Sequence, residues 1–412
     1  MRIRLVFCVI LCFGAARGAS PIVLRSRLIA GDLKGGYQVL ATDLNRDRRP
    51  DLIALSSSGG ELAWFENPGW RRHVIARGLR GLINVAAADL DGDGLPELAV
   101  AWEFSMRPRE SAGLIGLLRA GHDPRQPWSL RELDRLPASH RLRFATVDGK
   151  PPGVLVNAPL AGALAEPPDY SAPVPLVLYR PATWARETVS EELQGVLHGL
   201  AVTDWNNDGR EEILTASFRG LDLFERTPQG WRRTRLADGN PQPWPRSGAS
   251  EVAVGRLGRT RFLAAIEPWH GHLLVVYLPQ ADSWRRVVLD DRLAEGHALE
   301  TADFDGDRRD EIVAGYRARG GGLLVYRAQD GSGQRWEGRK LESGAMATSS
   351  CVVADLNADR RPDLACVGGA ELRWFENLTP ARRAPVAPAG RAPSRSPAQF
   401  SSPAPQADRR NQ

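Results

Sequence analysis

Short apolar runs alternate with polar, mostly acidic turns along most of this chain. One acidic cluster is preceded by Val85-Ala-Ala-Ala88 and followed by Leu98-Ala-Val100, and another is preceded by Val352-Val-Ala354. These flanks have the period of β-strands and lack the period of an amphipathic helix. The pattern therefore predicts strand, tight loop and strand, and it disfavours a helix-flanked EF-hand.

The acidic loop recurs five times with one spacing, in which oxygen-bearing side chains stand at positions 1, 3, 5 and 9. The copies are Asp43, Asn45, Asp47, Asp51; Asp89, Asp91, Asp93, Glu97; Asp204, Asn206, Asp208, Glu212; Asp303, Asp305, Asp307, Glu311; and Asp355, Asn357, Asp359, Asp363. Side chains at this spacing can wrap a hard divalent cation while a backbone carbonyl completes the shell, which predicts up to five structural calcium sites. The alternative is a set of solvated acidic turns.

The sixth position of the loop differs between copies. Glycine stands there at Gly94 and Gly209, whereas arginine stands there at Arg48, Arg308 and Arg360. Because a non-glycine residue with positive φ is disfavoured, the three arginine loops are expected to bind calcium more weakly.

The spacing of the loops predicts seven repeats. Two of the gaps between successive loops are about twice as long as the others, and each contains a degenerate copy, at residues 144–156 and 252–265. A strand opened by tryptophan gives a second marker of the repeat. It is found at Trp70, Trp128, Trp184, Trp231, Trp284 and Trp336.

The last repeat stops at Asn377 without its fourth strand, and residues 25–30 match that strand in pattern. Four-stranded units of about 50 residues, the last completed by an N-terminal strand, predict an all-β, seven-bladed β-propeller. A linear solenoid is the alternative, but it would need polar capping repeats, and the sequence does not show them.

The loops and aromatic strands resemble those of FG-GAP/VCBS repeat propellers, the group that includes the integrin α head. The likeness covers nearly all of residues 21–377. It implies calcium ligation by the five loops above, and the two degenerate repeats depart from the pattern.

The ends of the chain differ from the propeller in composition. Residues 1–19 combine Arg2 and Arg4 with an apolar run and small residues, which predicts a cleaved secretory signal and a secreted or periplasmic product. Residues 20–378 form the predicted propeller, and residues 379–412, rich in Pro, Ala, Ser and Arg, are expected to be disordered.

The net charge of the whole chain, +5, comes from these ends, since the predicted signal has three arginines and the tail has six. The segment between them is slightly negative, which argues against a nucleic-acid partner, and the apolar run of the signal is too short to span a membrane. Cys351 and Cys366 flank the last acidic loop and are compatible with either a disulfide or two buried thiols. The oligomeric state is not indicated.

Strand direction separates the acidic loops from a second set of polar residues. The loops join strands 1 and 2 of each blade, so the start of strand 1 and the turn from strand 2 to strand 3 lie at the opposite face, around the central channel. Asn84 and His140 fall at this rim. The candidate catalytic residues there are His198, Glu251, Glu267, His270, His272, His297, Arg219 and Arg317.

Two chemistries fit this rim. The histidines, with Glu267 as a further candidate, could bind a zinc-like divalent metal that polarises a substrate oxygen. Alternatively, a histidine acts as general base, Glu251 or Glu267 as acid, and Arg219 or Arg317 stabilises an oxyanion. Both chemistries suit β-elimination next to a carbonyl group. Trp102, Trp205 and Trp269 could offer apolar faces to a sugar, with Trp205 expected on the wrong side.

The segments 198–205, 248–251, 267–272 and 296–298 resemble, more loosely, the propeller domain of aldos-2-ulose dehydratases. The resemblance implies a carbon–oxygen lyase that dehydrates a keto-sugar or anhydro-sugar, without any isomerase step that belongs to the cupin domains of the fungal enzyme. The alternative function is a calcium-stabilised propeller that binds a carbohydrate or a surface protein without catalysis.

Overall fold

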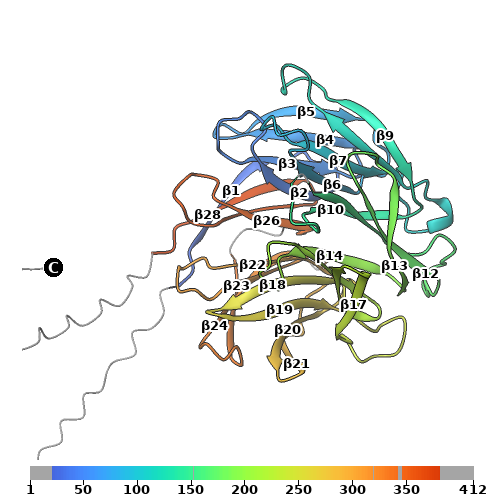
Figure 1. Cartoon of the computed structure of the whole chain (residues 1–412). Helices are drawn as coiled ribbons and strands as arrows, with labels where there is room; N and C mark the ends of the chain where they lie inside the picture. The colour runs from blue at the N-terminus through green and yellow to red at the C-terminus, as the bar shows by residue number, and fades with distance from the viewer. Residues whose placement is uncertain (1–20, 152, 319, 342–345, 381–412) are drawn as a thin grey trace, which may run out of the picture.

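The structure is a computed structural model, and it describes residues 21–151, 153–318, 320–341 and 346–380. The strands of these residues form seven four-stranded antiparallel sheets arranged as a ring (Figure 1). The predicted signal lies outside the described residues, as does nearly all of the predicted tail. In the described part of the chain, no helix has the length and hydrophobicity to cross a bilayer.

Each blade is a run of consecutive strands, except that the first strand of the chain joins the last blade. Blade 1 is β2 (Gly36–Thr42), β3 (Asp51–Ser56), β4 (Glu61–Glu66) and β5 (Arg71–Arg77); blade 2 is β6 (Asn84–Ala88), β7 (Glu97–Trp102), β8 (Leu114–Arg119) and β9 (Ser129–Arg135); blade 3 is β10 (Ser139–Ala145), β11 (Val154–Pro159), β12 (Pro173–Tyr179) and β13 (Arg186–Gln194); blade 4 is β14 (Leu197–Thr203), β15 (Glu212–Ser217), β16 (Gly220–Thr227) and β17 (Gly230–Ala237); blade 5 is β18 (Glu251–Leu257), β19 (Thr260–Glu267), β20 (Leu273–Gln280) and β21 (Ser283–Asp290); blade 6 is β22 (Gly296–Ala302), β23 (Glu311–Tyr316), β24 (Gly322–Ala328) and β25 (Trp336–Lys340); and blade 7 is β26 (Ser350–Ala354), β27 (Asp363–Gly368), β28 (Glu371–Asn377) and β1 (Leu24–Ala30). A short 3₁₀ helix, η1 (Pro108–Glu110), lies between β7 and β8.

The innermost strands surround the channel. β2, β6, β10, β14, β18, β22 and β26 each contact the next in this order, and β26 contacts β2 again. Antiparallel pairing of β1 with β28 completes blade 7, with Arg27 opposite Trp374. The predicted all-β, seven-bladed propeller and its closure by the N-terminal strand are therefore confirmed, including the two blades that lack the acidic loop.

The hydrophobic core is divided among the spaces between blades. Second strands such as β3, β7 and β15 are buried along their whole length, whereas the outer strand β5 alternates between buried and exposed positions. Seven clusters of apolar side chains each combine residues of two neighbouring blades, as Ile53 of blade 1 and Val100 of blade 2 do. Burying both faces of each inner strand holds the seven sheets as one ring.

Two local features refine the sequence predictions. Cys351 and Cys366 stand opposite each other on β26 and β27 and form a disulfide, which decides between the two states left open above. Thr379, assigned above to the tail, is buried, and its hydroxyl accepts a hydrogen bond from the backbone N–H of Val23. The packed part of the chain therefore reaches at least Thr379.

Candidate active site

Four innermost strands carry a β-bulge at the same place, next to their first residue. The register with the second strand shifts on either side of Tyr37 in β2, His140 in β10, His198 in β14 and His297 in β22. A bulge turns the side chain of the extra residue away from the alternation of its strand. Four blades thus direct one aromatic or imidazole side chain each toward the same end of the channel.

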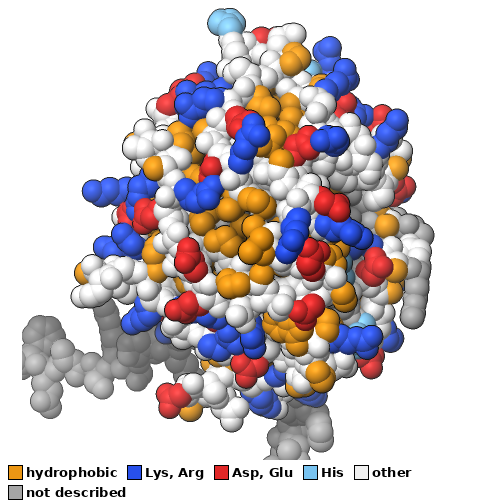
Figure 2. All heavy atoms as spheres, turned by 90° about the vertical axis from the view of Figure 1, so that its right-hand side faces the viewer, with side chains coloured by type: hydrophobic (Ala, Val, Ile, Leu, Met, Phe, Trp, Pro, Cys, Tyr) orange, Lys and Arg blue, Asp and Glu red, His pale blue; other side chains and the backbone are white. Residues whose placement is uncertain are grey.

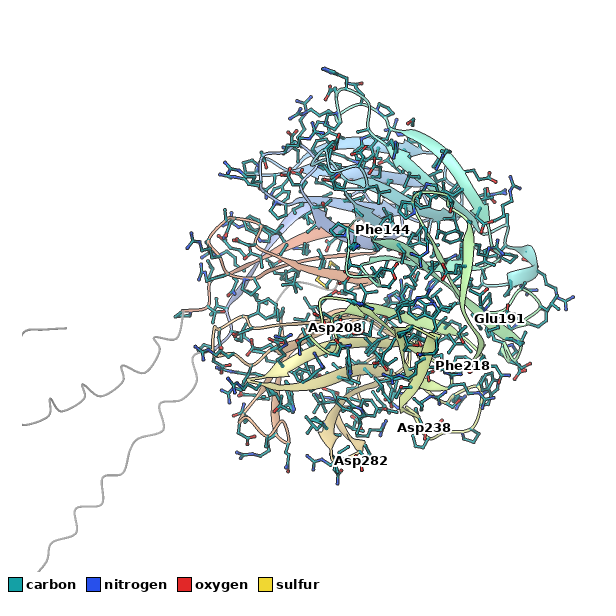
Figure 3. All side chains as sticks on the ribbon, in the orientation of Figure 1. Phe144, Glu191, Asp208, Phe218, Asp238 and Asp282 are labelled. Atoms are coloured by element: carbon teal, nitrogen blue, oxygen red, sulfur yellow. A yellow bond between two sulfur atoms is a disulfide. The ribbon has the colours of Figure 1, made fainter. Side chains whose placement is uncertain are left out.

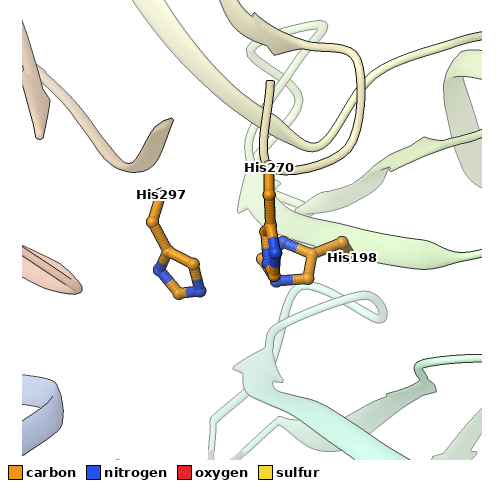
Figure 4. Close-up of side chains that lie close together, drawn as sticks. All are labelled: His198, His270 and His297. Atoms are coloured by element: carbon orange, nitrogen blue, oxygen red, sulfur yellow. The ribbon is translucent and has the colours of Figure 1, made fainter. Parts of the chain in front are cut away.

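The bulged residues meet at that end. The ring centres of His198 and His140 lie 4.9 Å apart, those of His198 and His297 5.0 Å, and those of Tyr37 and His297 5.2 Å. His270 joins them from the turn after β19, where its φ of 46° bends the backbone toward the channel. Figure 4 shows His198, His270 and His297 converging from three segments that are far apart in sequence.

A largely buried carboxylate lies beside His198. Glu251 lies 2.8 Å from Nδ1 of His198 and 2.6 Å from Nη2 of Arg141, through the same Oε1 atom. Arg141 also donates to the backbone carbonyl of His198. Nη2 of Arg141 and the hydroxyl of Ser250 also lie 3.4 Å from Nδ1 of His198. We assign the ring proton to Nδ1 because the contact with the carboxylate is the shortest, which leaves Nε2 as a hydrogen-bond acceptor.

His270 completes a chain of hydrogen bonds. Its Nε2 lies 3.2 Å from Nε2 of His198, and its Nδ1 lies 3.2 Å from Nη2 of Arg317. Because a guanidinium can only donate, Nδ1 of His270 accepts and its Nε2 carries the proton, which it gives to His198. The order of contacts is therefore Arg317, His270, His198 and Glu251.

Burial keeps these imidazoles neutral. It lowers the pKa of His270 to about 3, helped by the nearby charge of Arg317. Burial likewise holds the pKa of His140, His198 and His297 well below the ordinary value for histidine. The site therefore contains four neutral imidazoles at physiological pH.

All members of the cluster except His297 line a cavity of about 330 Å³. Its polar lining includes Tyr37, His140, His198, His270 and Arg317. A second cavity of about 390 Å³ continues along the channel between the innermost strands toward the acidic loops. The first volume is at the lower end of the range for small-molecule sites, and the convergence of polar groups in it marks a candidate active site.

Three predicted residues do not join this cluster. Glu267 is buried within blade 5, where Tyr277 donates to it at 2.5 Å and Arg286 at 2.6 Å. His272 is exposed beyond the turn that bends His270 inward, and Arg219 is exposed and stacks on Trp244. The expectation that they would meet the histidines is corrected by this placement, because position on the rim does not fix the direction of a side chain.

The tryptophans considered above are also separated. Trp269 lines the cavity, its ring centre 4.8 Å from that of His270. Trp102 is buried in the core between blades 1 and 2, and Trp205 lies on the acidic-loop side, packed against Trp284. Of the three, only Trp269 is placed to meet a ligand in this cavity.

Sequence reasoning missed Tyr37 and Arg141. Tyr37 stands six residues before the first aspartate of its blade, the same offset as His198 and His297, so the repeat itself carried the signal. Arg141 directly follows His140, but nothing in its local sequence indicates that it crosses to Glu251 in another blade.

The three histidines His198, His270 and His297 also satisfy part of what a zinc-like ion requires. Each offers a nitrogen within 4.8 Å of the others, and Nε2 of His297 is buried without a hydrogen-bond partner among the described residues. The Nε2 atoms of His198 and His270 have about the separation of two ligands on one tetrahedral ion. The donation from Arg317 to His270, however, favours a hydrogen-bonded pair of imidazoles.

The five acidic loops share one backbone geometry. In each, the N–H of the sixth residue donates to the first aspartate, at 2.7 Å for Arg48 and 2.9 Å for Gly94. The sixth residue has positive φ in every loop, so Arg48, Arg308 and Arg360 adopt the conformation that Gly94 and Gly209 adopt. Three carboxylates gather within 4.8 Å in the loop of Asp89, Asp91 and Glu97 and in that of Asp303, Asp305 and Glu311.

Comparisons with known proteins agree with this architecture. A family profile described as "Aldos-2-ulose dehydratase, beta-propeller domain" matches residues 112–280, which contain His198, Glu251 and His270. A profile described as "FG-GAP-like repeat" matches residues 43–100 and 303–366. Both resemblances predicted from the sequence are therefore confirmed.

Among curated proteins, the chain is similar to the aldos-2-ulose dehydratase of Phanerodontia chrysosporium. The two are 24% identical over 333 residues, which cover 71% of this chain and 36% of that protein. The chain thus spans about a third of the length of this relative.

Proposed function

We propose that this propeller is a carbon–oxygen lyase that removes water from a keto-sugar or anhydro-sugar by β-elimination. The observation that carries the proposal is the chain of polar contacts from Arg317 through His270 and His198 to Glu251, in which Arg317, His270 and His198 line one cavity. The similarity to a protein named for dehydratase activity supports the same reaction class.

The chain of hydrogen bonds suits proton abstraction from carbon. When a substrate carbonyl oxygen accepts the hydrogen bond that Arg317 otherwise donates to His270, Nδ1 of His270 is left with a free lone pair. This nitrogen can then remove a proton from the carbon next to the carbonyl group. His270 can pass its Nε2 proton to His198, and His198 can pass its Nδ1 proton to Glu251. The added positive charge is then neutralised by a carboxylate and does not stay on a buried imidazole.

Arg317 and Tyr37 provide the other two functions that the reaction needs. Arg317 is half-buried at the cavity and can stabilise the negative charge that develops on the carbonyl oxygen. The hydroxyl of Tyr37 lies 3.0 Å from Nε2 of His140 in the same cavity and can protonate the departing hydroxide. A zinc-like ion held by His198, His270 and His297 would instead polarise the carbonyl group.

Calcium and export belong to the same proposal. The five loops would hold calcium as a structural ion at the face opposite the histidines. The disulfide of Cys351 and Cys366 supports a product that leaves the cytosol, because disulfides persist mainly in oxidising compartments.

The proposal is tested by incubating the purified chain with a panel of keto-sugars and anhydro-sugars and following the ultraviolet absorbance of a new enone. We expect turnover that falls at least about 10²-fold in His270→Ala, the loss typical of a removed general base. His272→Ala, which changes an exposed histidine two residues away, is expected to keep full activity.

Two outcomes would overturn the proposal. Full activity in His270→Ala would reject the assigned base, and binding without turnover for every sugar would favour the non-catalytic propeller. Metal analysis of the active protein, before and after dialysis against a chelator, decides whether an ion takes part.

A further inference from the structure

One side of the active-site cavity is apolar. Leu82 and Ile83 before β6, Phe104 and Met106 after β7, and Leu160 after β11 line it. We define these five residues as the apolar wall. His270 and Arg317 come from blades 5 and 6, whereas the wall comes from blades 2 and 3, so these two polar residues stand across the channel from the wall. His140 of blade 3 lies beside the wall, with its ring centre 5.3 Å from that of Phe104.

The apolar wall is a built surface. The hydroxyl of Ser111 donates to the backbone carbonyl of Glu103, and the hydroxyl of Tyr170 donates to the carbonyl of Met106 at 2.9 Å. Behind it lies an additional apolar cluster that includes Leu160, Tyr170 and Phe218. These contacts fix the segment after β7 in place, so its apolar side chains face the cavity in a defined arrangement.

Part of this wall is open to water. Met106 is 48% exposed, and Phe104 and Trp269 are partly exposed at the same cavity. Figure 2 shows the face that forms the right-hand side of Figure 1, and hydrophobic side chains gather in the middle of this face, between charged ones. Figure 3 shows the side chains in the orientation of Figure 1. Gathered apolar surface at a hollow marks a binding site more often than isolated apolar residues do.

An unsubstituted sugar fits this cavity poorly. Hydroxyl groups that faced Phe104 and Met106, the exposed part of the wall, would lose their water without gaining a hydrogen bond. A ligand that is polar at one end and apolar at the other would pair its sugar with His270 and Arg317 and its apolar part with the wall.

We infer that the substrate is a keto-sugar that carries an apolar substituent, such as an alkyl or aryl aglycone, and that the apolar wall binds this substituent. The inference rests on the proposed function for the position of the sugar end.

The experiment measures binding of methyl, butyl and hexyl β-glucosides to the full chain by the change in tryptophan fluorescence. Trp269 lies in the cavity, so Trp269→Phe is expected to remove most of the signal. Each methylene group that enters the apolar wall should increase the affinity by about fourfold. Affinities that do not change with the length of the alkyl chain would overturn the inference.

Two matched variants locate the effect. Met106→Gln keeps the size of an exposed side chain and should reduce the gain per methylene group. Leu164→Gln changes an apolar residue that is 72% exposed and does not line the cavity, and it should leave the gain unchanged. The same gain in both variants would contradict the assignment of the wall.

The binding experiment can reject the apolar wall without rejecting the proposed lyase reaction, and the turnover experiment can reject the lyase without rejecting the wall. Graded affinities for the glucosides without turnover of any keto-sugar would support the wall and reject the lyase. Turnover of unsubstituted keto-sugars with equal affinities for the three glucosides would support the lyase and reject the wall.

Discussion

At Glu251, one carboxylate oxygen serves two buried partners, Arg141 and His198. In the reaction proposed here it is a positioning residue that also receives the proton. Glu251→Gln keeps the shape but removes the charge, so we expect turnover to fall about 10²-fold or more. Stability should fall by about 3 kcal/mol, because the charge of Arg141 is left buried and unpaired.

A double variant separates these two effects. Adding Arg141→Gln to Glu251→Gln removes the unpaired charge and should restore much of the free energy of unfolding without restoring turnover. Denaturant unfolding and enone formation, measured on the same preparations, check this. Activity that returns together with stability would show that Glu251 acts only on the fold.

Glu300 predicts a pH dependence of stability. It lies in the channel on β22, and burial raises its pKa to about 8. Between the ordinary value of about 4.5 and this value, the folded state binds a proton that the unfolded state has lost. Stability should therefore decrease as the pH rises through that window.

The matching variant is Glu300→Gln, measured by denaturant unfolding at pH 5 and pH 8.5. It should raise the free energy of unfolding by about 4 kcal/mol at the higher pH and change it little at the lower one. Glu191→Gln, at an exposed position, serves as the control. The same dependence on pH in both variants would argue against a protonated Glu300 in the channel.

The sequence predicted which residues of the site come together, but it did not predict the direction of every side chain. His198, His270 and His297 were predicted to converge and do so, because repeat position fixes which end of a strand reaches the rim. The opposite placements of His270 and His272 depend on a left-handed residue inside one turn. Nothing in the repeat pattern indicates that conformation at His270.

At the scale of elements, the acidic loop gives a prediction about backbone conformation. Gly209 has φ of 84°, and a Cβ added there would have no neighbour within 4 Å. The destabilisation by Gly209→Ala should therefore come from the left-handed backbone alone, at about 1 kcal/mol. Gly69→Ala, also without a close neighbour but outside the left-handed region, is the control for chemical unfolding.

Equal effects of the two alanine variants would contradict this account. Arg48, Arg308 and Arg360 already adopt a left-handed backbone, so replacing them with glycine offers the reverse experiment. The sequence predicted the disfavoured conformation at these arginines, and the φ values confirm it. Whether these loops bind calcium more weakly stays a prediction.

Strand number and order were predictable from the sequence, but the bulges were not. Repeating aspartates and tryptophans indicated seven blades, because each blade repeats one pattern of buried and exposed positions. A bulge arises when one strand has an extra residue relative to its partner strand. The local sequence of either strand does not show this mismatch. The four bulges at Tyr37, His140, His198 and His297 direct these side chains to one end of the channel, where they form the candidate site.

For the whole molecule, removal of calcium is the most direct experiment. If the five loops hold the ion, a chelator should lower the melting temperature strongly. An ion at a hundredfold excess over its dissociation constant stabilises the folded state by about 2.7 kcal/mol for each site. Calorimetry with and without chelator, followed by addition of calcium, checks this, and an unchanged melting temperature would indicate solvated loops.

The pairing of β1 with β28 has a consequence for how the protein is made. Arg27 and Glu376, which meet across this pair, are 349 residues apart in the chain. At the usual rate of synthesis, β1 has no partner for about 20 to 70 seconds after it leaves the ribosome. A chain interrupted shortly before β28 would hold six complete four-stranded blades, with β1 unpaired. The ring therefore closes only when β28, the last described strand, has been made.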